Sequence, residues 1–474
     1  MSMLAVGLLV SLLSGCRILH NPVATPVVTT PQSYVASTDS ASMGDRPFQT
    51  LFADSNLIAL IDTALARNLD LKIALQRITV ARANYGISQG ALLPQVDAVA
   101  TAGLDRFGRY TMNGVGNFDT NLSDNVTGPS LIPNPTPDFF AGFRASWEVD
   151  IWGKLRNRRR AAYNRMLASQ EGRNVVITAL TAELARLYYT LLALDAEGEI
   201  IRDNIGLQQK ALELVAVQKS AGRVTELAVQ QFRAQLLGTR SREGRVRQQI
   251  IETENQINVL LGRYPQPIAR GVSIRDQQLP ASVVAGIPAQ LVRRRPDIRQ
   301  AERELEAANV DVAVAQADFL PSLNLTPYVG LNAFRPSVLL SPASLAIGVL
   351  GSLAAPVFNR RLLKGNLAIS LAQSREAYLA YQRVILTGVS EVVSNLKGLE
   401  NYRDVADLQT QEVMVLRQAA TTSDELFAAN YATYLEVITA QRSVLDAELA
   451  LINTKQAQFL SLVDLYRALG GGWQ

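Results

Sequence analysis

The 474-residue sequence contains one cysteine and one histidine, Cys16 and His20, both close to its start. The rest of the chain therefore cannot assemble a Cys/His zinc cluster, a Cys-His dyad or a Ser-His-Asp triad. It also lacks the GxxxxGK(S/T) phosphate loop and the GxGxxG dinucleotide fingerprint. We therefore expect a protein that is not an enzyme, with no cofactor and no metal site.

An apolar run over residues 3–13 ends in the sequence Leu13-Ser14-Gly15-Cys16. The run is too short for a transmembrane helix and is typical of a signal peptide, so we expect residues 1–15 to be removed. The four residues resemble a bacterial lipobox, which predicts a lipid on Cys16. The alternative is an ordinary signal peptide with a cysteine there by chance. Residues 16–50, rich in Pro, Thr, Ser and Val, are expected to form a lipidated extended tether.

Two pairs of segments match each other along the chain, each pair at a constant offset. The segment from Arg67 matches the segment from Arg294, and the segment from Gly222 matches the segment from Asn430. This internal two-fold repeat predicts one structural repeat over 51–270 and a second over 271–474.

Proline is missing from 138–264 and from 357 to the end. Apolar residues recur there every three or four positions, as in Leu180, Leu184 and Leu187, which predicts long helices. A helix of this length reaches roughly 100 Å at 1.5 Å per residue and needs packed partners. The expected helices cover about 152–221, 224–262, 359–429 and 432–469.

Four segments that precede the long helices alternate apolar with polar residues, which predicts strands over about 94–108, 138–151, 321–334 and 343–357. Each reaches the roughly 9–11 residues that a tilted strand needs to cross a bilayer. In the second segment the parity of the pattern predicts that Asp138, Arg144, Glu148 and Asp150 face water, while Phe143, Trp147 and Val149 face lipid.

A soluble sandwich with one wet face would give a similar alternation. Two features favour the membrane: we expect no apolar helical stretch of about 18 residues after the signal peptide, and tryptophans end the second strand beside a basic cluster. Basic residues recur after the fourth strand, so we expect them to contact phospholipid head groups rather than nucleic acid, with a solvated helix face as the alternative. The expected interface residues are Trp147, Trp152, Arg156, Arg158, Arg159, Arg360 and Arg361.

Four strands cannot close a water-filled barrel, because membrane barrels begin at about eight strands and an open sheet edge in lipid is forbidden. The chain is therefore expected to form an oligomer. Two copies would supply eight strands and a filled interior, whereas three would supply twelve and leave room for a lumen.

Five ordered segments resemble the TolC-type outer-membrane factors, in the NodT/OprM-like lipoprotein branch. They are 291–326 with the signature RPDIRQAE at 295–302, WEVDIWGKLRN at 147–157, AGRVTELAVQQ at 221–231, YLEVITAQRS at 434–443 and LYRALGGGW at 465–473. The resemblance implies an α+β membrane protein. A trimeric, twelve-stranded outer-membrane β-barrel would continue into a long periplasmic α-helical barrel, with the protein in the outer membrane, lipid-anchored and extending into the periplasm.

The resemblance also implies the function, which is that of the outer-membrane channel of a tripartite efflux pump. The expected partners are two further copies, a periplasmic adaptor (membrane fusion protein), an inner-membrane resistance-nodulation-division transporter and outer-membrane lipid. The alternative is the exit channel of a type I protein or peptide secretion system, and a periplasmic coiled-coil scaffold would explain the helices but not the strands.

Two further sites follow from the resemblance. The family places a periplasmic gate where inner helices converge beyond the second helical hairpin, for which the candidates are Asp424, Glu425, Glu436 and Arg442; solvated charges on a helix face are the alternative. The adaptor is expected to dock at the two hairpin tips, with ordinary helix caps as the alternative. The candidate docking residues are Gly222, Arg223, Val224, Glu226, Leu227, Asn430, Thr433 and Leu435.

Overall fold

The computed structural model describes residues 31, 34, 42–280, 283–429 and 431–473. The expected signal peptide, the lipid site at Cys16, most of the tether and Asn430 lie outside the described residues. By their internal contacts the described residues divide into two compact units. Unit 1 contains 80–166 and 303–378, and unit 2 contains 167–302, 379–473 and the described residues before 80. Each unit therefore takes residues from both expected repeats.

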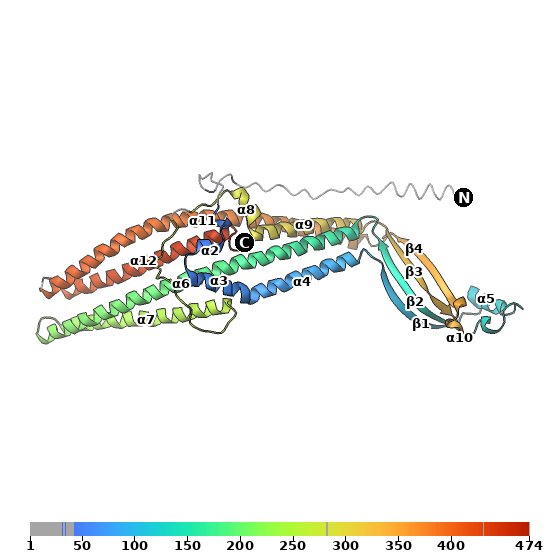
Figure 1. Ribbon diagram of the computed structural model, residues 1–474, viewed down its shortest axis with the longest axis horizontal. Helices are drawn as coiled ribbons and strands as arrows, with labels where there is room; N and C mark the ends of the chain where they lie inside the picture. Colours follow the sequence, from blue (N-terminus) through green and yellow to red (C-terminus); the bar gives the residue numbers. More distant parts are fainter. Residues whose placement is uncertain (1–30, 32–33, 35–41, 281–282, 430, 474) are drawn as a thin grey trace. The chain divides into compact units, whose positions relative to one another are not determined.

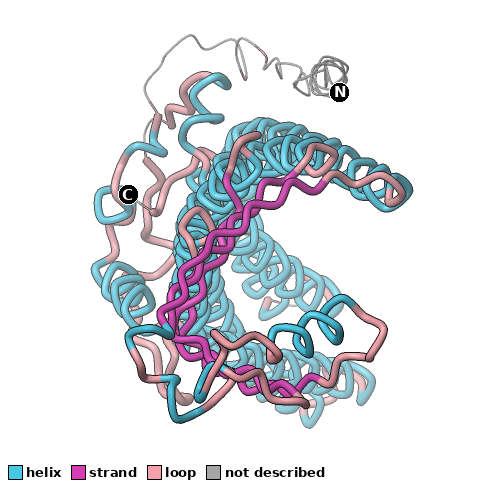
Figure 2. Tube along the Cα trace, turned by 90° about the vertical axis from the view of Figure 1, so that its right-hand side faces the viewer, coloured by secondary structure: helices cyan, strands magenta, loops and turns pink. Residues whose placement is uncertain are grey.

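Unit 1 holds a four-stranded antiparallel sheet in the order β1-β2-β3-β4 (Figure 1). The strands are β1 (Gln95–Asp105), β2 (Thr136–Val149), β3 (Ser322–Ala333) and β4 (Leu345–Ala354). Gln95 pairs with Ser146, Val149 with Leu323, and Ser322 with Ala354. The sheet is strongly curved along the strand order (Figure 2). Short helices α5 (Met112–Thr120) and α10 (Pro336–Leu339) lie in the loops that join β1 to β2 and β3 to β4.

Four long helices follow the strands, as α6 (Lys154–Ser220), α7 (Glu226–Leu260), α11 (Arg360–Ala428) and α12 (Tyr434–Ala468). The observed bounds of these helices and of the strands differ from the expected ranges by at most three residues at either end. In unit 2, α6 and α7 form one antiparallel hairpin and α11 and α12 form another (Figure 1). The remaining helices are α2 (Phe48–Leu51), α3 (Ser55–Arg67), α4 (Leu69–Gly90), α8 (Pro288–Arg294) and α9 (Pro296–Ala317).

The element bounds repeat the offsets seen in the sequence. Both the first and the last residue of α9 lie at the positions that match those of α4 under the offset that relates Arg67 to Arg294. Helices α7 and α12 have the same relationship under the offset that relates Gly222 to Asn430. Corresponding sequence positions therefore begin and end corresponding helices.

The main core of unit 2 gathers the middle of α6, the C-terminal part of α12 and the helices that precede α4. Tyr188 is fully buried and Tyr189 nearly so, and the Tyr189 ring stacks on Phe459 with centroids 4.7 Å apart. The hydroxyl of Tyr188 donates to Asp54 at 2.7 Å and accepts from the backbone N–H of Gly271 at 2.9 Å. The polar tip of Tyr188 thus has two partners, as burial of a tyrosine requires.

One expectation about apolar helices is wrong. Helix α6 contains a stretch of 18 residues with mean hydropathy 1.4, long and apolar enough to cross a membrane by composition alone. In the structure 61% of that stretch is buried within the protein. Packing against the other helices of unit 2 accounts for its apolar character, because buried helices are apolar on most of their faces.

Candidate functional site

The two faces of the sheet differ sharply in chemistry. The register aligns Asp97 with Arg144 and Arg144 with Tyr328, so these residues share one face. That face also carries Asp138 and Glu148, while the opposite face carries only Ala, Val, Leu, Ile, Phe, Trp, Pro and Gly residues. A sheet with one largely polar face and one continuous apolar face has the pattern of a channel wall in a membrane.

Asp150 does not belong to the polar face, although the alternation predicts it there. Strand β2 ends at Val149, and the Asp150 carboxylate accepts hydrogen bonds from the backbone N–H groups of Leu155 at 2.9 Å and Arg156 at 3.0 Å. It also pairs with the Arg156 guanidinium at 3.0 Å. Asp150 therefore satisfies the free N–H groups at the start of α6, a task that suits a carboxylate.

Both tryptophans at this junction are held through their indole N–H groups. Trp147 donates to the carbonyl of Leu92 at 3.0 Å, and Trp152 donates to the carbonyl of Pro321 at 2.7 Å. Trp152 remains 46% exposed. An apolar ring that is partly exposed and tied by its polar end suits a water–lipid boundary.

The basic residues around the junction fall into two groups. Arg156 takes part in the Asp150 network, whereas Arg158, Arg159, Arg360 and Arg361 are exposed on the first turns of α6 and α11. Exposed guanidinium groups on long apolar stems can reach phosphate groups at a membrane surface.

The first hairpin tip is built around Gly222. Its φ is +71°, and the N–H groups of Gly222 and Arg223 donate to the carbonyls of Lys219 and Gln218, both at 2.9 Å. These two bonds form the Schellman motif, which ends a helix with a left-handed residue and favours glycine there. Across the turn, Lys219 and Glu226 form an ion pair that lowers the pKa of the Glu226 carboxyl.

Val224, one of the candidate docking residues, is partly buried. It packs against the tip core, which consists of Val215, Ala228, Val229, Phe232, Phe427 and Val437. The apolar side chain turns inward because the Schellman turn brings the residues after the glycine back against α6. Leu227 and Leu435 remain exposed, at 54% and 57%.

The second hairpin tip surrounds residue 430, which the structure does not describe. The N–H of Tyr431 donates to the carbonyl of Leu426 at 2.8 Å, a bond that spans the same number of residues as Arg223 to Gln218. Thr433 is the N-cap of α12. The Tyr431 ring is 84% exposed.

The four gate candidates have different surroundings and different bonding partners. The Glu436 carboxylate accepts hydrogen bonds from the backbone N–H of Thr433 at 2.5 Å and from its hydroxyl at 3.0 Å, which lowers the pKa of Glu436. Gln441 donates to Asp424 at 3.4 Å, and partial burial raises the pKa of Asp424. Arg442 lies 3.7 Å from Asp446, and Glu425 is exposed. Within the described part of one chain, no hydrogen bond or ion pair joins any two of the four.

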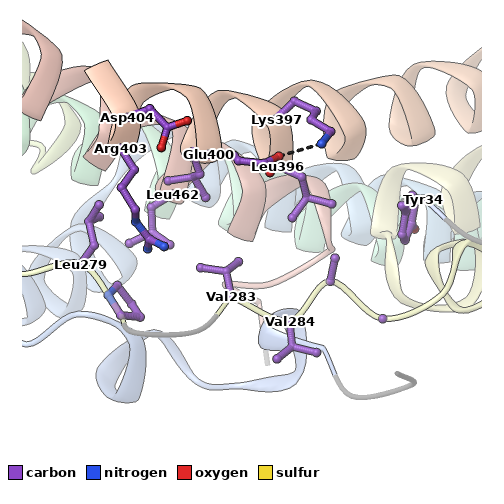
Figure 3. Close-up of a pocket in the computed structure, with 14 residues that line it drawn as sticks. Tyr34, Leu279, Val283, Val284, Leu396, Lys397, Glu400, Arg403, Asp404 and Leu462 are labelled. Carbon is purple, nitrogen blue, oxygen red and sulfur yellow. Dashed lines mark hydrogen bonds and ion pairs between the residues drawn. The ribbon is translucent and has the colours of Figure 1, made fainter. Parts of the chain in front are cut away.

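Unit 2 contains a cavity of about 500 Å³ between the chain at 279–280 and 283–286 and one face of α11 (Figure 3). Its lining includes the aliphatic side chains of Val283, Leu396 and Leu462 and several charged side chains of α11. Among the charged ones, Lys397 donates to Glu400 at 2.7 Å. The described lining contains neither Ser, Cys nor His.

The arginine of the RPDI segment, Arg295, is the centre of a network of ion pairs and hydrogen bonds that the sequence did not predict. Arg295 is 5% exposed and forms salt bridges of 2.7 Å with Asp297 and with Glu391 of α11. It also donates to the carbonyl of Ala468 in α12 at 3.0 Å. The segment thus ties the start of α9 to two long helices of unit 2. Its motif was visible in the sequence, but the distant partners were not.

The described residues contain no group of three or more Cys, His, Asp and Glu side chains placed to hold a metal ion. The charged residues that the structure brings together form helix caps and ion pairs, some within one helix, as for Lys397 and Glu400, and some between elements, as for Arg295 and Glu391.

Comparison with known proteins gives one consistent match. The model of the family described as outer membrane efflux protein matches residues 60–263 and 287–471. The cation efflux system protein CusC of Escherichia coli O6:H1 is 28% identical over 472 residues, covering 98% of this chain and 97% of that protein. The pyoverdine export outer membrane protein OpmQ of Pseudomonas aeruginosa is 30% identical over 471 residues, with the same coverage.

Two solved structures resemble this chain over nearly its whole length. A crystal structure of CusC has a TM-score of 0.79 and 26% identity, covering 95% of this chain and all of that one. The crystal structure of a membrane protein from Pseudomonas aeruginosa has a TM-score of 0.83 at 26% identity, covering 95% of this chain and 98% of that one.

Proposed function

The chain belongs to the outer membrane efflux protein family and is an outer-membrane component of a multi-component efflux system, and we propose that it works as a homotrimer whose sheets close into one twelve-stranded barrel. It is not an enzyme. Within an efflux pump it acts as the passive outer-membrane conduit. We further propose a periplasmic adaptor and a resistance-nodulation-division transporter as its partners, with a lipid on Cys16 as its anchor.

The main support for the trimer is that the sheet has two free edges, at β1 and at β4. In the described residues, no strand pairs with the outer edge of β1 or of β4. Every backbone N–H and C=O group in the hydrocarbon core of a bilayer needs a partner, so an open edge there costs several kcal/mol per unpaired group. Pairing β1 of one copy with β4 of the next removes all edges, and three copies leave room for a lumen.

Disulfide trapping tests this closure. Cysteines are placed singly on the apolar face of β1, at Ala98, Ala100 or Ala102, and combined with a cysteine at Ile347 or Val349 of β4. At least one combination should give covalent dimers and trimers in outer membranes after oxidation. A cysteine pair between Phe139 of β2 and Ile347 of β4 is the control, because β3 separates these strands. Monomers from every β1–β4 combination would contradict the proposal.

The polar face of the sheet would then line the lumen. We expect a membrane-impermeant maleimide to label Asp138→Cys but not Phe143→Cys, since these residues lie on opposite faces of β2. The reverse pattern would mean that the apolar face lines the water-filled space.

We propose the two hairpin tips as the docking surface for the adaptor. Arg223 and Leu227 are exposed on the first tip, which also carries the ion pair of Lys219 with Glu226. Thr433 and Leu435 are exposed on the second tip. Exposed apolar side chains beside fixed charges suit a protein interface with a defined register. The test is photo-crosslinking from position 223 or 433 in cells that express the adaptor. Crosslinks from position 109, in the loop between β1 and β2, but from neither tip would contradict this docking.

A further inference from the structure

Strand β2 carries one aromatic residue, Phe140, on the polar face of the sheet. Phe140 is only 4% exposed, although it lies among the residues of that face rather than in the core of unit 2. Its neighbours explain the burial. The Arg144 guanidinium carbon lies 4.6 Å from the centroid of the Phe140 ring, and the Tyr328 ring meets Phe140 edge-to-face with centroids 6.0 Å apart. We call Phe140, Arg144 and Tyr328 the arginine–aromatic shelf.

Glycines on the neighbouring strands make room for the two rings. A Cβ on Gly330 would lie 2.8 Å from the Phe140 ring, and a Cβ on Gly348 would collide with the Tyr328 ring. Each ring thus lies across the next strand of the sheet instead of standing out from it. The glycines are needed here because any side chain would lift the rings away from the sheet.

Within the shelf, the Phe140 ring holds the Arg144 guanidinium in a defined orientation. A guanidinium over an aromatic face is stabilised by about 0.5–1 kcal/mol at an exposed site, and its remaining N–H groups stay free to donate in the plane of the group. In the described part of the chain Arg144 forms no ion pair, whereas Glu148 on the same face is paired with Lys154 at 2.5 Å. Asp97 is aligned with Arg144 in the register but lies on the far side from Tyr328.

We propose that the shelf is a contact site for organic anions on their way through the channel, above all those that carry a carboxylate, sulfonate or phosphate beside an aromatic ring. The guanidinium fork would bind the anionic group, and the Tyr328 ring, 39% exposed, would contact the aromatic part. This inference rests on the proposed function, since it requires that the polar face line the lumen.

The test records single channels of the purified protein in planar bilayers, with naphthalene-2-sulfonate as the probe and methanesulfonate as its ring-free counterpart. Naphthalene-2-sulfonate should reduce the conductance of the wild-type channel at lower concentration than methanesulfonate does. Arg144→Gln should raise the blocking concentration about tenfold, the effect of losing one charge-assisted contact. Arg144→Lys should restore part of the block, because it keeps the charge but not the planar group.

Arg109→Gln is the matched control, since it removes the same charge from the exposed loop between β1 and β2. It should leave the block unchanged. Equal block of wild-type and Arg144→Gln channels, or an equal loss in Arg109→Gln, would overturn the shelf while leaving the channel in place. Absence of conductance from inserted wild-type protein would overturn the channel and the shelf with it.

Discussion

Arg295 donates a hydrogen bond to the carboxylate of Glu391 at 2.7 Å, joining the residue between α8 and α9 to the middle of α11. The same carboxylate accepts from Arg467 of α12 at 3.1 Å, so one acid links three elements of unit 2. Arg295 is buried, and removal of one partner from a buried ion pair leaves the charge of the other partner poorly compensated.

We therefore predict that Arg295→Met lowers the stability of unit 2 by about 3 kcal/mol. Arg293→Met, two positions earlier at an exposed site, is the control and should change stability by less than about 0.5 kcal/mol. Thermal unfolding of the two variants in detergent measures the difference. Equal unfolding midpoints would mean that the network around Glu391 contributes little.

The left-handed conformation of Gly222 allows a test of the first hairpin tip as the proposed docking surface. A β-branched residue in the left-handed region costs roughly 1–2 kcal/mol, so Gly222→Val should distort the turn and abolish efflux while the outer-membrane part stays folded. Gly206→Val is the matched control, because residue 206 lies within α6 and a Cβ there meets no atom within 4 Å. Efflux assays and outer-membrane protein yield separate the two effects. Normal efflux by Gly222→Val would remove the tip from adaptor docking.

Glu436 has two candidate roles that substitutions can separate. A glutamine at position 436 can still accept the two hydrogen bonds from Thr433 but carries no charge. An alanine there loses the hydrogen bonds as well as the charge. If Glu436 lines a gate, Glu436→Gln should lower the cation preference of the channel, because three carboxylates brought together attract cations. If it only caps α12, Glu436→Gln should be silent and Glu436→Ala should loosen the start of the helix. Reversal potentials measure the first effect and hydrogen exchange at Thr433 the second.

The same cap should depend on pH. Hydrogen bonds from Thr433 lower the pKa of Glu436, so its contribution to stability is present above the pKa of the unfolded chain and is lost as the pH falls through the lowered value. Protection of the Thr433 amide should therefore decline on acidification in the wild type but not in Glu436→Gln. Identical pH profiles for the two proteins would contradict this assignment.

The lipid site at Cys16 is open to a direct test. We predict that mass spectrometry of the mature N-terminus finds residue 16 acylated, and that Cys16→Ala leaves an unprocessed or unlipidated protein. The proposed trimer should survive this change, because a closed barrel would itself hold the protein in the membrane. An unmodified Cys16, or cleavage elsewhere, would contradict the anchor.

Local patterns in the sequence were sufficient for the strands and the long helices. Alternation placed β2 and proline-free apolar periodicity placed α6, because both depend only on which residues neighbour each other along the chain. Features that depend on capping or on packing were missed. Asp150 caps the start of α6, a few residues further along the chain, and Val224 packs against the tip core. Phe140 lies flat on the polar face because Gly330, in a strand from the other half of the chain, makes room.

Single-channel recording tests whether this protein is a passive conduit. Purified wild-type protein, inserted into a planar bilayer with no transporter, adaptor or nucleotide, should give uniform conductance steps, each from one trimer with an open aqueous path or with a gate that fluctuates. Crosslinked trimers from the β1–β4 cysteine pairs should give steps of the same size. Membranes that contain the inserted protein but pass no current under any voltage would show that the protein is not a passive conduit.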